Sequence, residues 1–420
     1  MSANKLTLSA GDLTVDISAR LGAEYFNANN STNGNGLQAA ATGSGQFAQG
    51  TQLSFPMDGF TVQPVSRVNA LGYSSEKNAP ALDFLGSTAV GTYNVDFAVQ
   101  VKPTEAGVVL PKAYVSVASD YGTLKAGQDY GLYGSQAREL DNTVGYVVGT
   151  TARGHVGAGR SSVPSKKLMV YTIPEMGGLS ASVGITSPVA AGRVTDSQEL
   201  ANGGFRNNVI APSELGLEAA LSYDIGSYFP IPGFEAKIFA SGLSQDVRSV
   251  FSGDNAGATT IINRTEFSTK ATGFDYGTKI SGMGFELAAV GFNANGLGVV
   301  DQLSGGISGI QAATGLTAAS VGKRKSNGAM VQASYILPIV GTVLQGSWGN
   351  SRLQANENGA DTVDTTGNRL DRNEMFTVGL RQDMTEDLNF KLEFAKSKAR
   401  NVQARENVQQ SVAFGAKWRF

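Results

Sequence analysis

The charged residues between positions 129 and 167 are the group whose types and spacing could act on a passing solute. They comprise three acids and five bases: Asp129, Arg138, Glu139, Asp141, Arg153, Arg160, Lys166 and Lys167. Opposite charges held across a narrow, low-dielectric passage orient dipolar solutes and tune ion preference. Residues 129–165 also form a connection far longer than an ordinary loop. A solvated external loop would explain this stretch, but we favour a loop folded into a lumen, where it forms a constriction.

Catalytic and metal chemistry find little support in the residue inventory. The chain has no cysteine and one histidine, His155, so zinc sites and histidine-based triads are nearly excluded. Glu139 and Asp141 could form a glycosidase-like carboxylate pair, but such a pair needs a fixed cleft. The glycine spacing of 154–159 lacks the preceding βαβ unit of a nucleotide site. We therefore predict a protein that is not an enzyme, with no cofactor and no metal.

The last ten residues alternate strictly between an apolar and a polar face. One parity holds Val412, Phe414, Ala416, Trp418 and Phe420, and the other holds Ser411, Ala413, Gly415, Lys417 and Arg419. A period of two indicates a strand. Its two large aromatic residues stand at the extreme carboxyl end, where chains usually fray. The end strand of a closed barrel with an apolar outside and a wet lumen explains both features.

The same alternation runs from residue 13 to residue 420, so the sequence predicts one domain over 1–420. Residues 13–25 form a first strand that could pair with the last one and close the barrel, which removes both sheet edges. The basic residues on the polar parity would then line the lumen. They are Arg20, Lys102, Lys237, Arg381, Lys391, Lys417 and Arg419. The fold class is therefore all-β, a closed antiparallel transmembrane β-barrel.

The connections between strands are expected to differ in length at the two ends of this barrel. Short turns are predicted at 120–122, 174–178 and 385–387. Long polar connections are predicted at 27–50, 186–213, 242–270, 293–326 and 349–373. Short periplasmic turns and long external loops are typical of transmembrane barrels. The two helix-period stretches, around 135–142 and 307–320, are short and lie between strands.

Composition and charge narrow the function classes further. The 33 basic and 35 acidic residues are balanced, which argues against nucleic acid as a partner. No run of about 20 apolar residues is present, as a membrane-spanning helix would need. The search for such a run does not detect membrane-spanning β-strands, because apolar lipid-facing residues alternate with polar lumen-facing residues along each strand. Residues 1–4 show no basic-then-apolar signal segment, so we expect a mature form given a start methionine.

Four segments resemble the general porins of the Gram-negative outer membrane: 113–128, 129–134, 171–180 and the terminal hairpin that ends at Phe420. The resemblance implies sixteen strands, although the length also fits eighteen, a homotrimer, and a third loop folded into the lumen. It also implies an outer-membrane location against the lipid bilayer and lipopolysaccharide, with Phe420 as the assembly signal. The family's acidic Pro-Glu-Phe-Gly-Gly motif is absent, and residues 138–142 stand in its place.

The function expected from these features is passive diffusion of small hydrophilic solutes and ions through a water-filled channel. The excess of bases in 129–167 and the missing acidic motif favour a weak anion preference. A substrate-specific porin for carboxylates or phosphate is the alternative, favoured if Arg138, Arg153, Arg160, Lys166 and Lys167 converge. An outer-membrane enzyme or adhesin on the same barrel, with His155 as its one histidine, and a secreted surface-layer component are the remaining hypotheses.

Overall fold

The computed structural model describes residues 5–33, 67–72, 80–104, 107–140, 165–188, 206–211, 214–229, 231–254, 261–298, 306–309, 321–356, 370–401 and 406–420. These residues contain twenty strands, all paired antiparallel, with one short α-helix, α1 (Ser135–Leu140), and one turn of 3-10 helix, η2 (Gly226–Tyr228). The strands are β1 (Leu6–Ala10), β2 (Leu13–Asn33), β3 (Arg67–Gly72), β4 (Ala81–Val90), β5 (Tyr93–Thr104), β6 (Gly107–Ser119), β7 (Gly122–Tyr130), β8 (Ser165–Thr172), β9 (Leu179–Thr186), β10 (Arg206–Ala211), β11 (Gly216–Asp224), β12 (Glu235–Asp254), β13 (Ile261–Gly282), β14 (Phe285–Asn295), β15 (Ile307–Gly309), β16 (Val321–Ile336), β17 (Val343–Asn356), β18 (Leu370–Asp383), β19 (Leu388–Asn401) and β20 (Glu406–Arg419).

The described strands form a closed barrel of sixteen positions around the wall. β3 and β4 both pair with β2, β10 and β11 both pair with β12, and β14 and β15 both pair with β16. Each of these pairs therefore occupies one position in the wall. β1 is an extra short strand that pairs with the start of β2. The prediction of sixteen strands, rather than eighteen, is confirmed.

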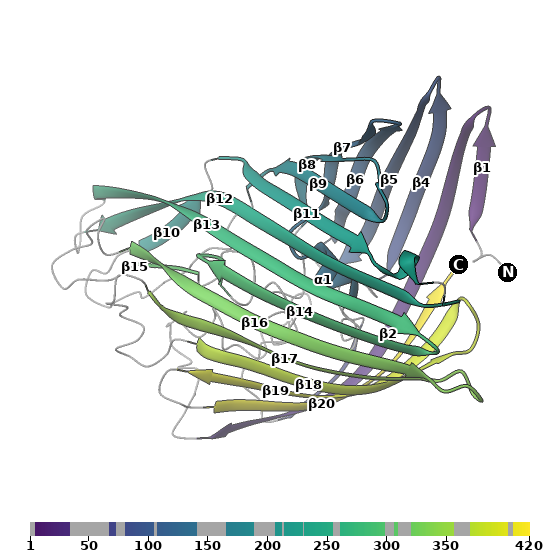
Figure 1. Cartoon of the computed structure of the whole chain (residues 1–420). Helices are drawn as coiled ribbons and strands as arrows, with labels where there is room; N and C mark the ends of the chain where they lie inside the picture. Colours follow the sequence, from purple (N-terminus) through teal and green to yellow (C-terminus); the bar gives the residue numbers. More distant parts are fainter. Residues whose placement is uncertain are drawn as a thin grey trace.

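The first and last long strands close the barrel, as the sequence predicted. β2 and β20 pair from Arg20↔Arg419 to Asn33↔Glu406. The Phe420 N–H donates to the Ala19 carbonyl oxygen at 2.8 Å, and the Phe420 carbonyl oxygen accepts from the Ala19 N–H at 2.6 Å. Both chain ends consequently lie at the same end of the barrel (Figure 1).

The two faces of the wall differ in the way the alternation predicts. On β20, Val412, Phe414 and Trp418 are 47 to 51% exposed on the outside, whereas Ser411 and Ala413 on the inner parity are almost fully buried. Large exposed apolar side chains continue around the outer face, for example Val115, Leu124, Val183, Leu217, Ile238, Phe274, Leu287, Val331 and Leu380. An apolar outer band around a polar interior is the arrangement of a barrel immersed in lipid.

The connections at the chain-terminal end have two to ten residues, the longest being the one between β11 and β12 that contains η2, and those at the other end vary more widely in length. The predicted turns at 120–122, 174–178 and 385–387 lie at the short-turn end. The prediction of a loop at 242–270 is wrong. β12 and β13 pair in register through most of this stretch, starting at Asp254↔Ile261 and continuing toward the short-turn end. The sequence of this stretch resembles that of a loop because it is rich in Ser, Thr, Gly and Asn, although Leu243 and Val247 are buried on the inner face.

Two smaller expectations also have outcomes in the described residues. The helical pattern at 135–142 corresponds to α1, whereas residues 307–309 of the second pattern form β15. In the described part of the chain, no helix is long and apolar enough to cross a membrane.

The two faces predict the outcome of cysteine labelling, for which the cysteine-free chain is a clean background. We expect Lys125→Cys and Lys417→Cys, on the inner parity, to react in membranes with a charged, membrane-impermeant maleimide. Val183→Cys and Phe414→Cys, on the outer parity, should stay unlabelled because lipid excludes the reagent. Equal labelling of the two pairs would contradict the assignment of the faces.

Candidate functional site

The segment that follows β7 turns onto the inner face of the wall. The Tyr133 N–H donates to Glu218 Oε2 of β11 at 3.1 Å, and the Gly134 N–H donates to Ser241 Oγ of β12 at 3.1 Å. Both acceptors point to the inner face of the wall. Their strand parity is the reverse of that of Leu217, which is exposed on the outer face. The start of the predicted constriction loop is thus tied to the barrel wall, inside the ring of strands (Figure 1).

A buried ion pair lies beneath this attachment. Lys166 Nζ contacts Glu218 Oε1, and the two side chains are only 2% and 0% exposed. Glu218 therefore joins three elements: its own strand β11, Lys166 of β8 and the backbone of Tyr133. Residues Lys166 and Glu218 are 52 positions apart in the sequence. Removing one partner of such a pair leaves an uncompensated buried charge, which is strongly destabilising.

Two glycines allow the segment to approach the wall this closely. A Cβ on Gly131 would lie 2.6 Å from Glu218 Oε2, and a Cβ on Gly273 of β13 would lie 2.7 Å from the Tyr133 hydroxyl oxygen. Both distances are too short for real contacts, so a larger residue would force the facing side chains to shift, Glu218 and Lys166 at Gly131, or Tyr133 and Leu297 at Gly273. The Tyr133 side chain is fully buried in the resulting contact.

The helix α1 packs on an apolar patch of the inner wall. Ala137 of α1 is buried against Phe239 of β12, Val290 of β14 and Met330 of β16, and Leu140 packs at the edge of this cluster. Lys237 Nζ donates to Gln136 Oε1 at 2.9 Å, and the Gln332 side-chain amide donates to the Leu140 carbonyl oxygen. The helix is therefore held by apolar contacts along one side and by polar contacts near both ends.

Basic side chains gather around Tyr130, where β7 ends. The Arg138 guanidinium carbon lies 3.8 Å from the centroid of the Tyr130 ring, and Lys112 Nζ of β6 lies 5.8 Å from it. These distances are those of cation–π contacts. Arg20 of β2 is within electrostatic range of Tyr130 and Arg138. Two strands, β2 and β6, and α1 thus contribute bases to one region of the lumen.

The acids of this region are engaged by neighbours. Asp129 Oδ2 forms an ion pair with Lys125 Nζ at 2.7 Å, and Asp83 accepts a hydrogen bond from the Gln100 side chain. Arg20 also acts electrostatically on Asp83. Positive charge therefore predominates around Tyr130.

The structure places the predicted site residues unevenly. Asp129, Arg138, Arg20 and Lys102 lie on the inner side, Lys102 being almost fully buried, and Glu139 is exposed on α1. Lys166 also faces inward, but as the buried partner of Glu218. Asp141, Arg153, Arg160 and His155 lie outside the described residues.

The assignment of Lys167 to the lumen is wrong. Lys167 pairs with Gln128 on the outer parity, together with the exposed Met169 and Tyr171. The reason is the strict alternation of strand side chains, which sends Lys166 and Lys167 to opposite faces of β8.

Sequence reasoning missed Glu218, Tyr133, Ser241 and Asp275, which anchor the segment from inside. Ser241 Oγ, which accepts from Gly134, itself donates to Asp275 Oδ1 of β13. One signal could have pointed to part of this site: large apolar residues recur on the inner parity of β12, β14 and β16, with Phe239, Val290 and Met330 among them.

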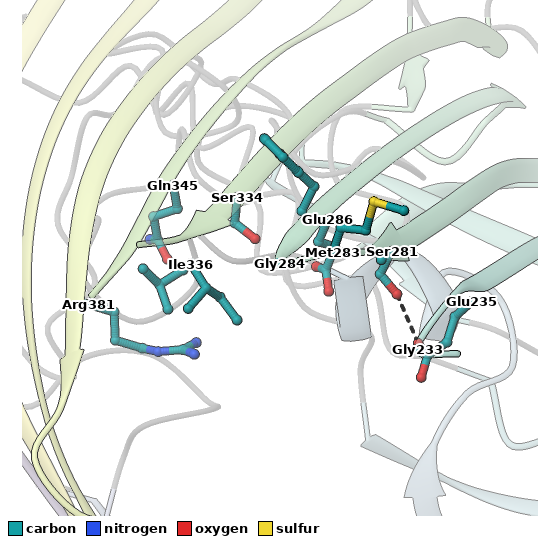
Figure 2. A pocket seen from close by; sticks show the side chains of 13 residues that line it. Gly233, Glu235, Ser281, Met283, Gly284, Glu286, Ser334, Ile336, Gln345 and Arg381 are labelled. Carbon is teal, nitrogen blue, oxygen red and sulfur yellow. Dashed lines mark hydrogen bonds between the residues drawn. The ribbon is translucent and has the colours of Figure 1, made fainter. Parts of the chain in front are cut away.

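A recess of about 290 Å³ opens at the short-turn end of the wall, between β12, β13, β14 and β16–β18. Figure 2 shows Arg381 on one side of it and Glu235 and Glu286 on the other. Lys279 Nζ lies 3.1 Å from Glu286 and 3.7 Å from Glu235, so these acids are partly balanced. Among the described residues, no group of three or more acidic or histidine side chains could hold a metal ion.

Comparisons with known proteins rest on the fold alone. No protein-family model matches the sequence, and no curated protein is significantly similar to it. The outer membrane channel DcaP of Acinetobacter baumannii matches over the whole of both chains, with 12% identity and a TM-score of 0.66. The chain has the porin fold.

Two further solved structures agree with this result. The anion-selective porin from Comamonas acidovorans has 13% identity and a TM-score of 0.58, and the match covers 97% of this chain and 100% of that one. The OmpF protein of Salmonella typhi, solved with daunomycin, has 13% identity and a TM-score of 0.54, with 99% and 100% of the chains covered.

Proposed function

We propose that this protein forms a water-filled channel in the Gram-negative outer membrane for passive diffusion of small hydrophilic solutes and ions. The observation that carries the proposal is the closed sixteen-strand barrel with an apolar outside, a charged inside and a segment, 130–140, docked on the inner wall. Such a segment narrows a lumen without closing it. Passage is then selected by solute size and by the charges beside the segment, and no catalytic step is part of the proposal.

Weak anion preference is the finer part of this proposal. Arg138, Lys112 and Arg20 gather around Tyr130, whereas Asp129 is neutralised by Lys125. One protein of the same fold is named as an anion-selective porin. At physiological ionic strength the Debye length is about 8 Å, so charges on a narrow lumen still act on a passing ion.

Neutralising the bases around Tyr130 tests this preference. We expect Lys112→Ala with Arg138→Ala to shift the reversal potential in a salt gradient toward cation preference, and the shift should grow as salt is lowered because screening weakens. The measurement is single-channel recording in planar bilayers.

Lys167→Ala is the matched control, because it removes a base from the outer face. Its reversal potential should equal that of the wild type. If the double variant also keeps the wild-type reversal potential at low salt, the bases around Tyr130 do not set ion preference.

A homotrimer in contact with lipid and lipopolysaccharide completes the proposal. A Vibrio cholerae outer membrane protein of the same fold, OmpT, has been solved in a trimer form, with 12% identity, a TM-score of 0.53 and 97% and 99% of the two chains covered. Sedimentation analysis in detergent, before and after heating, would distinguish a trimer from a monomer.

A channel specific for carboxylates or phosphate would need convergent bases. Of the five residues named for it, only Arg138, Lys166 and Lys167 lie in the described part of the chain, and they do not converge. Lys166 is buried against Glu218 and Lys167 faces outward. The general diffusion channel is therefore the function we propose.

A further inference from the structure

The recess at the short-turn end of the wall is lined by polar side chains from five neighbouring strands. They lie on the inner parity and follow one another in register: Glu235↔Ser281, Ser281↔Glu286, Glu286↔Ser334 and Ser334↔Gln345. Arg381 of β18 lies one inner position beyond the end of this series, and Figure 2 shows it across the recess from Glu286. The recess therefore opens to the lumen, with an acid and a base on opposite sides.

The acidic side of the recess keeps a net negative charge. Glu286 Oε2 lies 3.1 Å from Lys279 Nζ, and Glu235 Oε2 lies 3.7 Å from the same nitrogen. Two carboxylates thus share one ammonium group, which leaves one formal negative charge. Lys237, the next base on the inner parity of β12, instead donates to Gln136 of α1 at 2.9 Å. A positively charged group that enters the recess would therefore be attracted to this side.

The basic side of the recess carries the Arg381 guanidinium. Its Nε lies 3.3 Å from Asp383 Oδ1, and both side chains are more than two-fifths exposed. Exposed ion pairs of this kind contribute little free energy, so a solute carboxylate can compete with Asp383. Lys391, which lies opposite Arg381, is buried in an ion pair with Glu393 at 3.1 Å. That pair is neutral, and Arg381 is the base that faces the recess.

Apolar side chains lie beside Arg381 in the recess. Ile336 of β16 pairs in register with Val343 of β17, and Val343 pairs in register with Arg381. The hydrocarbon part of a solute would contact these residues while its carboxylate meets the guanidinium. The volume of about 290 Å³ is at the lower limit of ligand pockets, which span about 300–1,000 Å³. The occupant is therefore a small solute.

We propose that this recess transiently binds zwitterionic solutes of amino-acid size, with the solute carboxylate on Arg381 and the solute ammonium on Glu286. A guanidinium binds a carboxylate through two parallel hydrogen bonds, which fixes the orientation of the solute. Opposed charges favour a solute that carries both signs, since an anion would meet the carboxylates and a cation would meet Arg381. The inference deepens the proposed diffusion channel and rests on it, because the solute reaches the recess through the lumen.

The test measures binding of L-leucine to the full-length protein in deuterated detergent by saturation-transfer NMR. Saturation transferred to the leucine methyl protons gives the half-saturating concentration. We expect Arg381→Gln and Glu286→Gln each to raise this concentration about tenfold, because each removes a hydrogen bond between charged groups. Isocaproate, which lacks the ammonium group, and isoamylamine, which lacks the carboxylate, should bind the wild type about tenfold more weakly than L-leucine for the same reason.

Lys417→Gln is the matched control, because it removes an inner base of β20 that does not line the recess. It should bind L-leucine as the wild type does, and equal weakening in this control and in Arg381→Gln would overturn the proposal in favour of non-specific attraction. Isocaproate that binds as tightly as L-leucine would overturn it in favour of an anion site, and isoamylamine that does so would overturn it in favour of a cation site. Wild-type affinity in both recess variants would overturn it as well.

Channel recordings separate this inference from the proposed function. The NMR measurement needs a folded barrel, whereas the proposed function needs a barrel that conducts ions in a planar bilayer. A wild-type protein that conducts normally but shows no saturation transfer to L-leucine would reject the recess as a binding site and leave the channel intact. A wild-type protein that forms no channel would reject the proposed function, whatever the NMR result.

Discussion

Glu218→Ala is expected to destabilise the barrel and to raise its single-channel conductance. The change leaves the buried Lys166 without its partner, which costs about 3–5 kcal/mol of unfolding free energy. It also removes the acceptor of the Tyr133 N–H, one of the contacts that hold the segment before α1 on the wall. Denaturant unfolding in detergent and recordings in planar bilayers measure the two effects. Glu235→Ala is the control. This exposed acid lies 3.7 Å from Lys279, so its replacement should change the unfolding free energy by less than about 1 kcal/mol.

A double variant separates the two roles of Glu218. Replacing a buried ion pair by apolar residues of similar size is often neutral for stability, so Lys166→Met with Glu218→Leu should recover much of the lost stability. It cannot accept the hydrogen bond from Tyr133, so its conductance should remain altered. If Glu218→Ala and the double variant both conduct as the wild type does, segment 130–140 does not narrow the lumen, and the constriction lies elsewhere.

Deleting Phe420 is expected to abolish most insertion into the outer membrane. The residue forms the last ladder pair of the closing seam, with both backbone hydrogen bonds to Ala19, and its ring lies 5.0 Å from that of Trp418 on the outer face. The deletion therefore removes a backbone pair and an interfacial aromatic together. Immunoblots of outer-membrane fractions, comparing heated and unheated samples, measure the folded barrel.

Two further variants identify which property of Phe420 matters. Phe420→Ala keeps the backbone pair and removes the ring, so we expect an intermediate loss. Lys417→Ala, on the inner parity of the same strand, should insert as the wild type does. Normal insertion of the protein that lacks Phe420 would reject its role as an assembly signal.

Strand parity carried most of what could be predicted without a structure. Successive side chains of a strand point to opposite faces, so the alternation at 13–25 and 411–420 already indicated a two-faced barrel and a seam between its first and last strands. The seam is present as β2 and β20. Parity also placed Arg20 and Lys102 inside the barrel. The assignment of Lys167 to the lumen was wrong because it rested on the charge of the residue and not on its strand parity.

Local composition was a weaker guide to strand ends. Residues 242–270 resemble a loop because they are rich in Ser, Thr, Gly and Asn, yet residues 242–254 belong to β12 and residues 261–270 to β13. Hydrogen bonding between strands does not depend on side-chain polarity, so a ladder can continue above the apolar band. Only the register of the paired strands shows where it stops.

The sequence by itself determined the fold class and the two faces of the wall, because both follow from a period of two along each strand. The candidate site was decided by the tertiary structure, because its contacts join residues far apart in the chain. The pairing of β9 with both β8 and β11, and the inward turn after β7, bring Glu218 to Lys166 and Tyr133. Phe239, Val290 and Met330 become a docking patch only when α1 lies on them. Within their own strands these residues are one acid and three apolar side chains on the inner parity, and no local pattern indicates their partners.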